Sequence, residues 1–158
     1  MTRNLDWKAA ISAGIAAGIV FLMLEMILIA TIQGQSPWGP PRMMAAIVMG
    51  KDVLPPPATF DFGIIMVAMI IHLMLSMLFG AMLGWAISHW QMSLVTALMA
   101  GTAFGLIIYF VDFYGFTAIF PWFAMARGPI GIFAHAVFGV VLAGVYHGIA
   151  KPVVLATP

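Results

Sequence analysis

The sequence predicts an all-α integral membrane four-helix bundle made of two related helical hairpins. Of the 158 residues, 64% are hydrophobic and only 7% are charged, whereas a typical soluble domain carries about 25% charged residues. The mean hydropathy is +1.12, and four separate segments are long enough to cross a bilayer. The order of the polar residues also recurs in the two halves of the chain. Together these observations favour a single membrane domain over residues 1–158.

Four apolar runs define the expected spans. They cover residues 9–32, 62–88, 93–119 and 129–150, and each reaches the roughly 20 residues that a helix needs to cross the hydrocarbon core. We expect helices because a helix satisfies its own backbone hydrogen bonds inside lipid, and the runs are far too long for barrel strands. The first run lacks an Ala-x-Ala cleavage pattern before its end, so we expect a retained span rather than a signal peptide.

The connections between the spans differ in length. Little more than "SHWQM" joins the second and third spans, which predicts a tight antiparallel hairpin. The first connection is longer and bounded by prolines, and residues 41–50 can form a short helix between Pro41 and Gly50. Because its side chains include the apolar Met43 and Ile47, we expect this helix to lie on the membrane surface. An irregular loop is the alternative.

Four spans place both termini on the same side of the membrane. The basic residues are Arg3, Lys8 and Lys151 on that side, and Arg42, Lys51 and Arg127 on the other. Since the numbers are equal, the positive-inside rule gives no orientation. We expect both termini to be cytoplasmic, because this leaves the short "SHWQM" turn inside and the longer Pro-Trp loops outside.

The net charge of +1 excludes a nucleic-acid partner, and a chain without cysteine has no disulfide framework.

An internal repeat links the two halves of the chain. A shift of 87 positions aligns "AISAGIAAG" with "ALMAGTAFG", and seven residues beyond each final glycine stands an acid, Glu25 or Asp112. A Pro-Trp pair and an arginine then follow in both halves, and His72 and His135 each begin a ridge of small residues at four-residue steps. A chance likeness between Ala/Gly-rich spans is the alternative. A duplicated helix pair predicts a pseudo-twofold axis along the membrane normal.

The acids and the two repeated histidines are expected to face the interior of the bundle. Eleven residues separate Gly14 from Glu25, which returns to within about 20° of the same helix face, and Asp112 stands in the same relation to Gly101. Small residues mark faces on which membrane helices approach each other closely. The expected packing positions are Gly14, Gly18, Gly80, Gly101, Gly105 and Gly139.

Three interpretations of Glu25, His72, Asp112 and His135 stay open. A charge at mid-bilayer costs about 2.5–3.5 kcal/mol on insertion scales, and an acid–histidine pair offsets much of that cost. In the main interpretation these pairs only fix helix register, in a non-catalytic accessory or scaffolding subunit without a cofactor. In the second interpretation the four side chains hold a divalent metal in mixed nitrogen and oxygen coordination, or relay protons as transport requires.

The third interpretation is electron transfer through haem b, with His72 and His135 as axial ligands. A second haem would need His89 and His147, which lie 17 and 12 residues further along the same spans. These spacings turn the second ligand away by about 100° and 120°, which argues against two haems. The sequence contains no G-x-S-x-G, Walker or H-E-x-x-H motif, so we expect no enzyme activity.

The stretch "QSPWGPPRMMAAIVMGKDVLPPPATFD", taken with the overall pattern of the chain, resembles uncharacterised small four-span bacterial inner-membrane proteins. The resemblance implies a multi-pass protein of the bacterial inner membrane and supports the four-span topology. It carries over no functional residue. The partners that we expect are the lipid bilayer and either further copies of the chain, in a homo-oligomer, or other membrane subunits.

Overall fold

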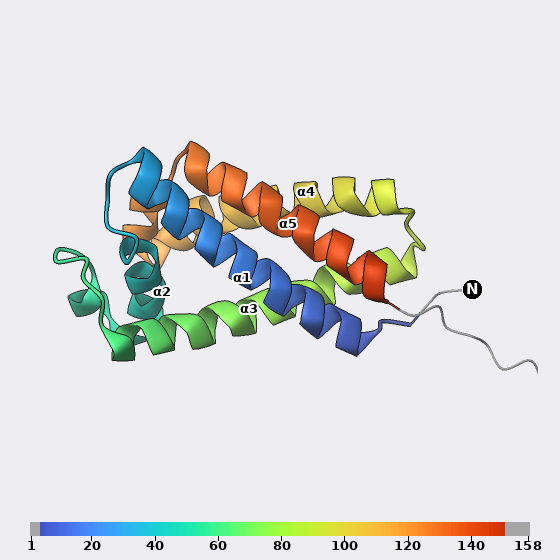
Figure 1. The fold of residues 1–158 in the computed structure, drawn as a ribbon, viewed down its shortest axis with the longest axis horizontal. Coiled ribbons are helices and arrows are strands. Elements are labelled where there is room, and N and C mark those ends of the chain that lie inside the picture. The colour runs from blue at the N-terminus through green and yellow to red at the C-terminus, as the bar shows by residue number, and fades with distance from the viewer. Residues whose placement is uncertain (1–3, 151–158) are drawn as a thin grey trace, which may run out of the picture.

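The computed structural model describes residues 4–150, and Arg3 and Lys151 lie outside this range. Four helices are long and apolar enough to cross a membrane, as the sequence predicted. They are α1 (Trp7–Ile32), α3 (Phe62–His89), α4 (Leu94–Phe110), which continues through shorter turns to Ala118, and α5 (Pro129–Ile149). All four run along the length of the molecule (Figure 1). The described part of the chain is therefore a helical multi-pass membrane protein with no strand.

Three of the spanning helices begin at a polar side chain that accepts a hydrogen bond from the backbone. The carboxylate of Asp6 accepts from the N–H of Ala9 at 3.0 Å, and the carboxylate of Asp61 accepts from Ile64 at 3.0 Å. The hydroxyl of Ser93 accepts from the third residue of its helix in the same way. Such caps satisfy N–H groups that have no partner within the helix, so they fix the points at which the apolar runs become helical.

A shorter helix, α2 (Gly39–Met49), forms where the sequence predicted one, and it lies across one end of the bundle (Figure 1). Prolines stand in its first turn, and it ends at Gly50, whose φ of 83° favours glycine. The guanidinium of Arg42 is buried and donates hydrogen bonds to the carbonyls of Val53 and Thr59 at 3.0 and 2.9 Å. Arg42 therefore holds the loop after α2 against the end of the bundle.

Glycines bring the helices together as two closely packed pairs. In the pair α1–α3, a Cβ added to Gly14 would lie 2.5 Å from the carbonyl oxygen of Ser76. In the pair α4–α5, a Cβ added to Gly101 or to Gly139 would collide with the carbonyl group of the other residue. Gly18, Gly80 and Gly105 also face backbone or short side chains of the paired helix. Only glycine allows the backbones to approach this closely.

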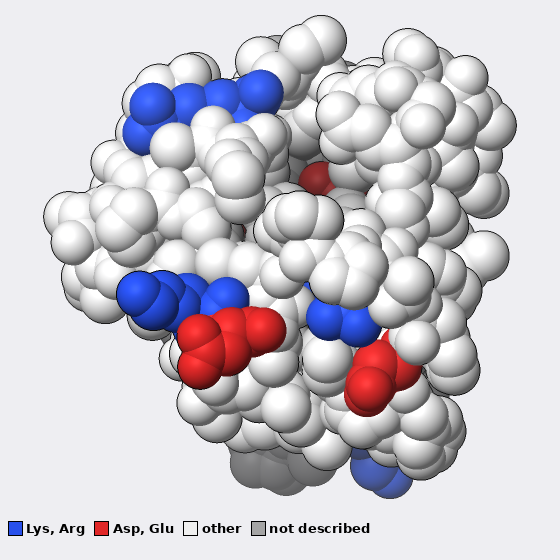
Figure 2. Space-filling view, turned by 90° about the vertical axis from the view of Figure 1, so that its left-hand side faces the viewer, with Lys and Arg blue, Asp and Glu red and all other residues white. Residues whose placement is uncertain are grey.

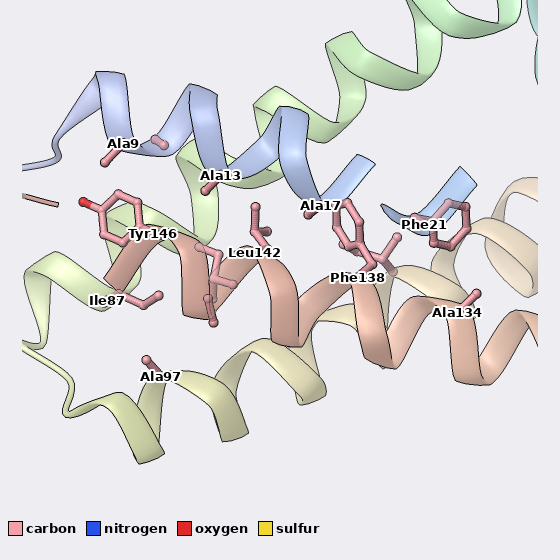
Figure 3. Packing of buried hydrophobic residues seen from close by; sticks show 14 residues of the cluster. Ala9, Ala13, Ala17, Phe21, Ile87, Ala97, Ala134, Phe138, Leu142 and Tyr146 are labelled. Carbon is pink, nitrogen blue, oxygen red and sulfur yellow. The ribbon is translucent and has the colours of Figure 1, made fainter. Parts of the chain in front are cut away.

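A third contact joins the two pairs through α1 and α5. Figure 3 shows Ala9, Ala13 and Ala17 of α1 facing the larger Phe138, Leu142 and Tyr146 of α5. Small side chains on one helix thus receive large ones from the other, and most of the members of this cluster are fully buried.

The short turn expected between α3 and α4 is present, since α3 ends at His89 and α4 begins at Leu94, but the two helices do not pack along their length. The two helices meet near their connecting turn and then diverge along the molecule (Figure 1). The small-residue face of α3, which carries Ser76 and Gly80, packs on α1, and the glycine face of α4 packs on α5. Neither helix keeps a small-residue face for the other. A pseudo-twofold axis would relate the long α1–α5 contact to a similar contact between α3 and α4. That contact is absent from the described residues, so the expected pseudo-twofold arrangement is not seen. The internal repeat stays a prediction.

The third span is not a continuous α-helix to residue 119. The α-helix ends at Phe110, and a π-helical turn, η2 (Val111–Gly115), is followed by two short 3₁₀ segments, η3 (Phe116–Ala118) and η4 (Pro121–Ala126). Arg127 supports this break, because its Nε donates to the carbonyl of Phe113 at 2.7 Å and its guanidinium lies 4.3 Å from the ring centre of Tyr114. After Phe110, the hydrogen bonds of the π and 3₁₀ turns and those of Arg127 therefore replace the hydrogen-bond pattern of an α-helix.

Candidate functional site

A cavity of about 290 Å³ lies inside the bundle towards the end that carries α2 and η4. Helices α1, α3 and α5, the last turns of α4, and the covering segments α2 and η4 all contribute to its wall. Seen from this end, the molecule has a hollow with an acidic side chain inside it (Figure 2). The volume is about twice that of an engineered ~150 Å³ cavity that binds benzene, so the space is large enough for a molecule of one or two rings.

The four side chains singled out in the sequence all line this cavity. Glu25 is on α1, His72 is on α3, Asp112 is on the π turn, and His135 is on α5. The remaining wall is almost entirely apolar, and seven of its twenty residues are phenylalanines. A largely apolar cavity with a few convergent polar groups is the usual form of a small-molecule site.

Asp112 and His135 form the closest acid–histidine pair. The Oδ2 atom of Asp112 lies 3.8 Å from Nε2 of His135, while Nδ1 of His135 donates a hydrogen bond to the carbonyl of Gly131 at 2.8 Å. The backbone bond fixes the imidazole so that Nε2 faces the acid. At 3.8 Å the contact is electrostatic rather than a direct hydrogen bond. The π turn sets the direction of Asp112, as such turns often do at functional sites.

His72 has a backbone partner instead of an acid. Its Nε2 donates a hydrogen bond to the carbonyl of Gly18 at 2.9 Å. A Cβ on Gly18 would make only an ordinary contact of 3.4 Å with this nitrogen, but it would lie 2.6 Å from Oγ of Ser76, so the close approach of α3 requires the glycine. His72 therefore links α1 to α3 and does not share a proton with either carboxylate.

Of the four side chains, Glu25 has the fewest polar partners. The residue is only 7% exposed, and no hydrogen bond from any described residue reaches its carboxylate. No fully enclosed side-chain oxygen or nitrogen among the described residues lacks a hydrogen-bond partner, so the carboxylate oxygens of Glu25 must reach the cavity. His135 lies within electrostatic reach of Glu25, but its Nδ1 donates to the carbonyl of Gly131 and its Nε2 faces Asp112.

The cavity does not bring the predicted metal ligands together. Within the described residues, no three His, Cys, Asp or Glu side chains are close enough to hold one metal ion. Glu25, His72, Asp112 and His135 are suitable donors for a divalent metal by chemistry, but they are spread over the wall. The metal centre of the second interpretation therefore finds no ready ligand group among the described residues.

The residues do not fit a haem between His72 and His135 either. The ring of Phe21 lies between the two imidazoles, stacked on His72 at 5.6 Å between ring centres and edge-on to His135 at 4.7 Å. A porphyrin would need that space. His89 stacks on the exposed Trp85 at 5.0 Å, so a second haem in the bundle also lacks a suitable ligand.

Sequence reasoning missed the aromatic part of the wall. Phe21 contacts both imidazoles, and Phe113 and Tyr109 pack edge-on against His135. Phe21 lies one helical turn before Glu25, so its place on the inward face could have been derived from the same periodicity. The contribution of Met43 from α2 could not, because it depends on how α2 folds across the end of the bundle.

Comparisons with protein-family models, with curated proteins and with solved structures gave no match for this chain. The resemblance to four-span bacterial inner-membrane proteins therefore stays a prediction, and the site is interpreted from its own geometry.

Proposed function

We propose that this multi-pass membrane protein binds a small, largely apolar molecule in the cavity between its helices. The observation that carries the proposal is the cavity of about 290 Å³, with aromatic walls and a few polar groups. The wall of this cavity is almost entirely apolar, and apolar side chains gain packing contacts with an apolar molecule that lies against them. A ligand that enters the cavity would supply those contacts.

The accessory or scaffolding role predicted from the sequence has less support. Its interface would have to lie on the exposed apolar side chains of the spanning helices. The lipid bilayer alone already requires such side chains there, so they do not indicate a protein partner. We also propose that the protein lies in a bacterial inner membrane with both termini cytoplasmic. The orientation is a proposal because each side carries three basic residues, so the positive-inside rule does not decide it.

We also infer that the two helix pairs descend from one duplicated unit. What supports this is the correspondence of their closest contacts. Gly14 faces Ser76 in the first pair and Gly101 faces Gly139 in the second, and Ser76 and Gly139 each lie four residues after a repeated histidine. In this view the copies later diverged in how they pack on each other.

The binding proposal is tested by filling the cavity from its wall. Leu75 lines the cavity and is 36% exposed, whereas Leu78 on the same helix is 54% exposed and is not part of the wall. We expect Leu75→Trp to weaken binding of 1-ethylnaphthalene at least tenfold, and Leu78→Trp to leave it unchanged. Isothermal titration of the purified proteins in the same detergent measures this, and micelle partitioning cancels between the variants. Equal affinities in both variants, or no saturable binding to the unmodified chain, would refute the proposal.

A further inference from the structure

The polar chemistry of the cavity wall, above all that of Glu25, limits the class of ligand that the cavity can bind. This side chain is more than nine-tenths buried, and its carboxylate reaches the cavity without a hydrogen-bond donor from any described residue. An ionised carboxylate only accepts hydrogen bonds, and a buried polar group without a partner is costly. The group that would best complete this site is therefore a donor on the ligand.

Both imidazoles of the wall already have partners, and the remaining polar side chain of the wall, the hydroxyl of Ser76, carries no charge. Nε2 of His72 donates to Gly18, and Nδ1 of His135 donates to Gly131. The second nitrogen of His135 faces Asp112. Neither imidazole offers these N–H groups to an anionic ligand, and Asp112 has a partner that Glu25 lacks. Glu25 is thus the acid that remains to bind a positive charge.

The aromatic wall suits a cation as well. Phe21, Phe113 and Phe138 lie around the polar side of the cavity, and further phenylalanines complete the wall. The face of an aromatic ring attracts an ammonium group, and the attraction grows when water is excluded. The same rings pack well against the apolar part of a ligand.

We propose that the ligand is a small lipophilic amine, bound as its ammonium ion with an N–H donated to the Glu25 carboxylate and its ring system packed among the phenylalanines. This inference rests on the proposed function, since it assigns the ligand of the same cavity. A volume of about 290 Å³ limits the apolar part to one or two rings.

The test compares two probes of nearly identical shape. 1-Naphthylmethylamine carries a positive charge at neutral pH, and 1-ethylnaphthalene replaces the ammonium group with a methyl group. We expect the unmodified protein to bind the amine about tenfold more tightly or better, which corresponds to about 1.4 kcal/mol. Glu25→Gln should remove this preference, which is measured as the ratio of the two affinities within the same variant. The matched variant Asp112→Asn should keep most of the preference.

The outcomes separate this inference from the proposed function. If 1-ethylnaphthalene binds but the amine has no advantage, or if Glu25→Gln keeps the advantage, the amine assignment is wrong and the binding function stands. A preference for 1-naphthylacetate, the anionic counterpart, would also overturn the assignment. If none of the probes binds saturably, both proposals fail. Far-UV circular dichroism and saturable binding of the neutral probe show that each variant is folded.

Discussion

Replacing Gly139 with alanine tests the close packing of α4 on α5. A Cβ at this position would lie 2.6 Å from the carbonyl carbon of Gly101 and closer still to its oxygen. Ordinary contact begins at 3.4 Å, so the carbonyl carbon is about 0.8 Å too close and the two backbones must separate. Overpacking of this kind costs about 1–3 kcal/mol, and it occurs where neither partner has a flexible side chain that could move aside.

A second glycine on α5 provides the control. At Gly144 the nearest atom to an added Cβ is Cδ2 of Leu98 at 3.5 Å, an ordinary contact. Gly144→Ala therefore gains the same helix propensity, up to about 1 kcal/mol, without the collision. The difference between Gly139→Ala and Gly144→Ala isolates the steric cost, and we expect it to be about 1–3 kcal/mol in the free energy of unfolding.

The measurement is unfolding in mixed micelles with an increasing fraction of sodium dodecyl sulfate, followed by the helical circular dichroism signal. Gly139→Ala should unfold at a clearly lower fraction than Gly144→Ala, and both should have native helix content before the titration. Equal midpoints, or a more stable Gly139→Ala, would show that the backbones of α4 and α5 do not approach as closely as described.

Two further predictions concern the ends of the bundle. Tyr146→Phe removes the hydroxyl that lies 2.5 Å from Oγ of Ser88, so it should lower the free energy of unfolding by about 1 kcal/mol. In the same assay, Tyr114→Phe at an exposed position should leave the free energy of unfolding unchanged. Arg42→Met removes the donors that hold the loop after α2 and should speed limited chymotrypsin cleavage there, whereas the exposed Lys51→Met should leave the rate unchanged. Unaltered cleavage in Arg42→Met would count against the described role of the guanidinium.

The spanning helices could be predicted from the sequence because their cause is local. Length and apolar character decide whether a segment crosses a membrane, and caps such as Asp61 and Ser93 stand directly before the apolar runs. The inward face was also predictable, since Gly14 and Glu25 share one side of a regular helix. Both properties depend on residues a few turns apart.

The cavity and the interaction partners of the polar groups could not be predicted in the same way. The π turn at Asp112 depends on Arg127, which reaches back to the carbonyl of Phe113. His72 was expected to pair with an acid, and the closer backbone carbonyl of Gly18 accepts its hydrogen bond instead. These arrangements depend on side chains from different helices, whose relative placement no single periodicity encodes.

The position of the cavity follows from where the glycines are. The small-residue face of α3 packs on α1, and that of α4 packs on α5. Beyond their shared turn, α3 and α4 therefore touch only through larger side chains such as Phe79 and Phe104, and they diverge from the turn (Figure 1). The open end is partly covered by α2 and η4, which are joined by a hydrogen bond from Nε1 of Trp122 to the carbonyl of Met43 at 3.1 Å. Glu25 and Asp112 both line the cavity at this end of the bundle. The same packing that makes the bundle tight on one side therefore leaves the cavity on the other.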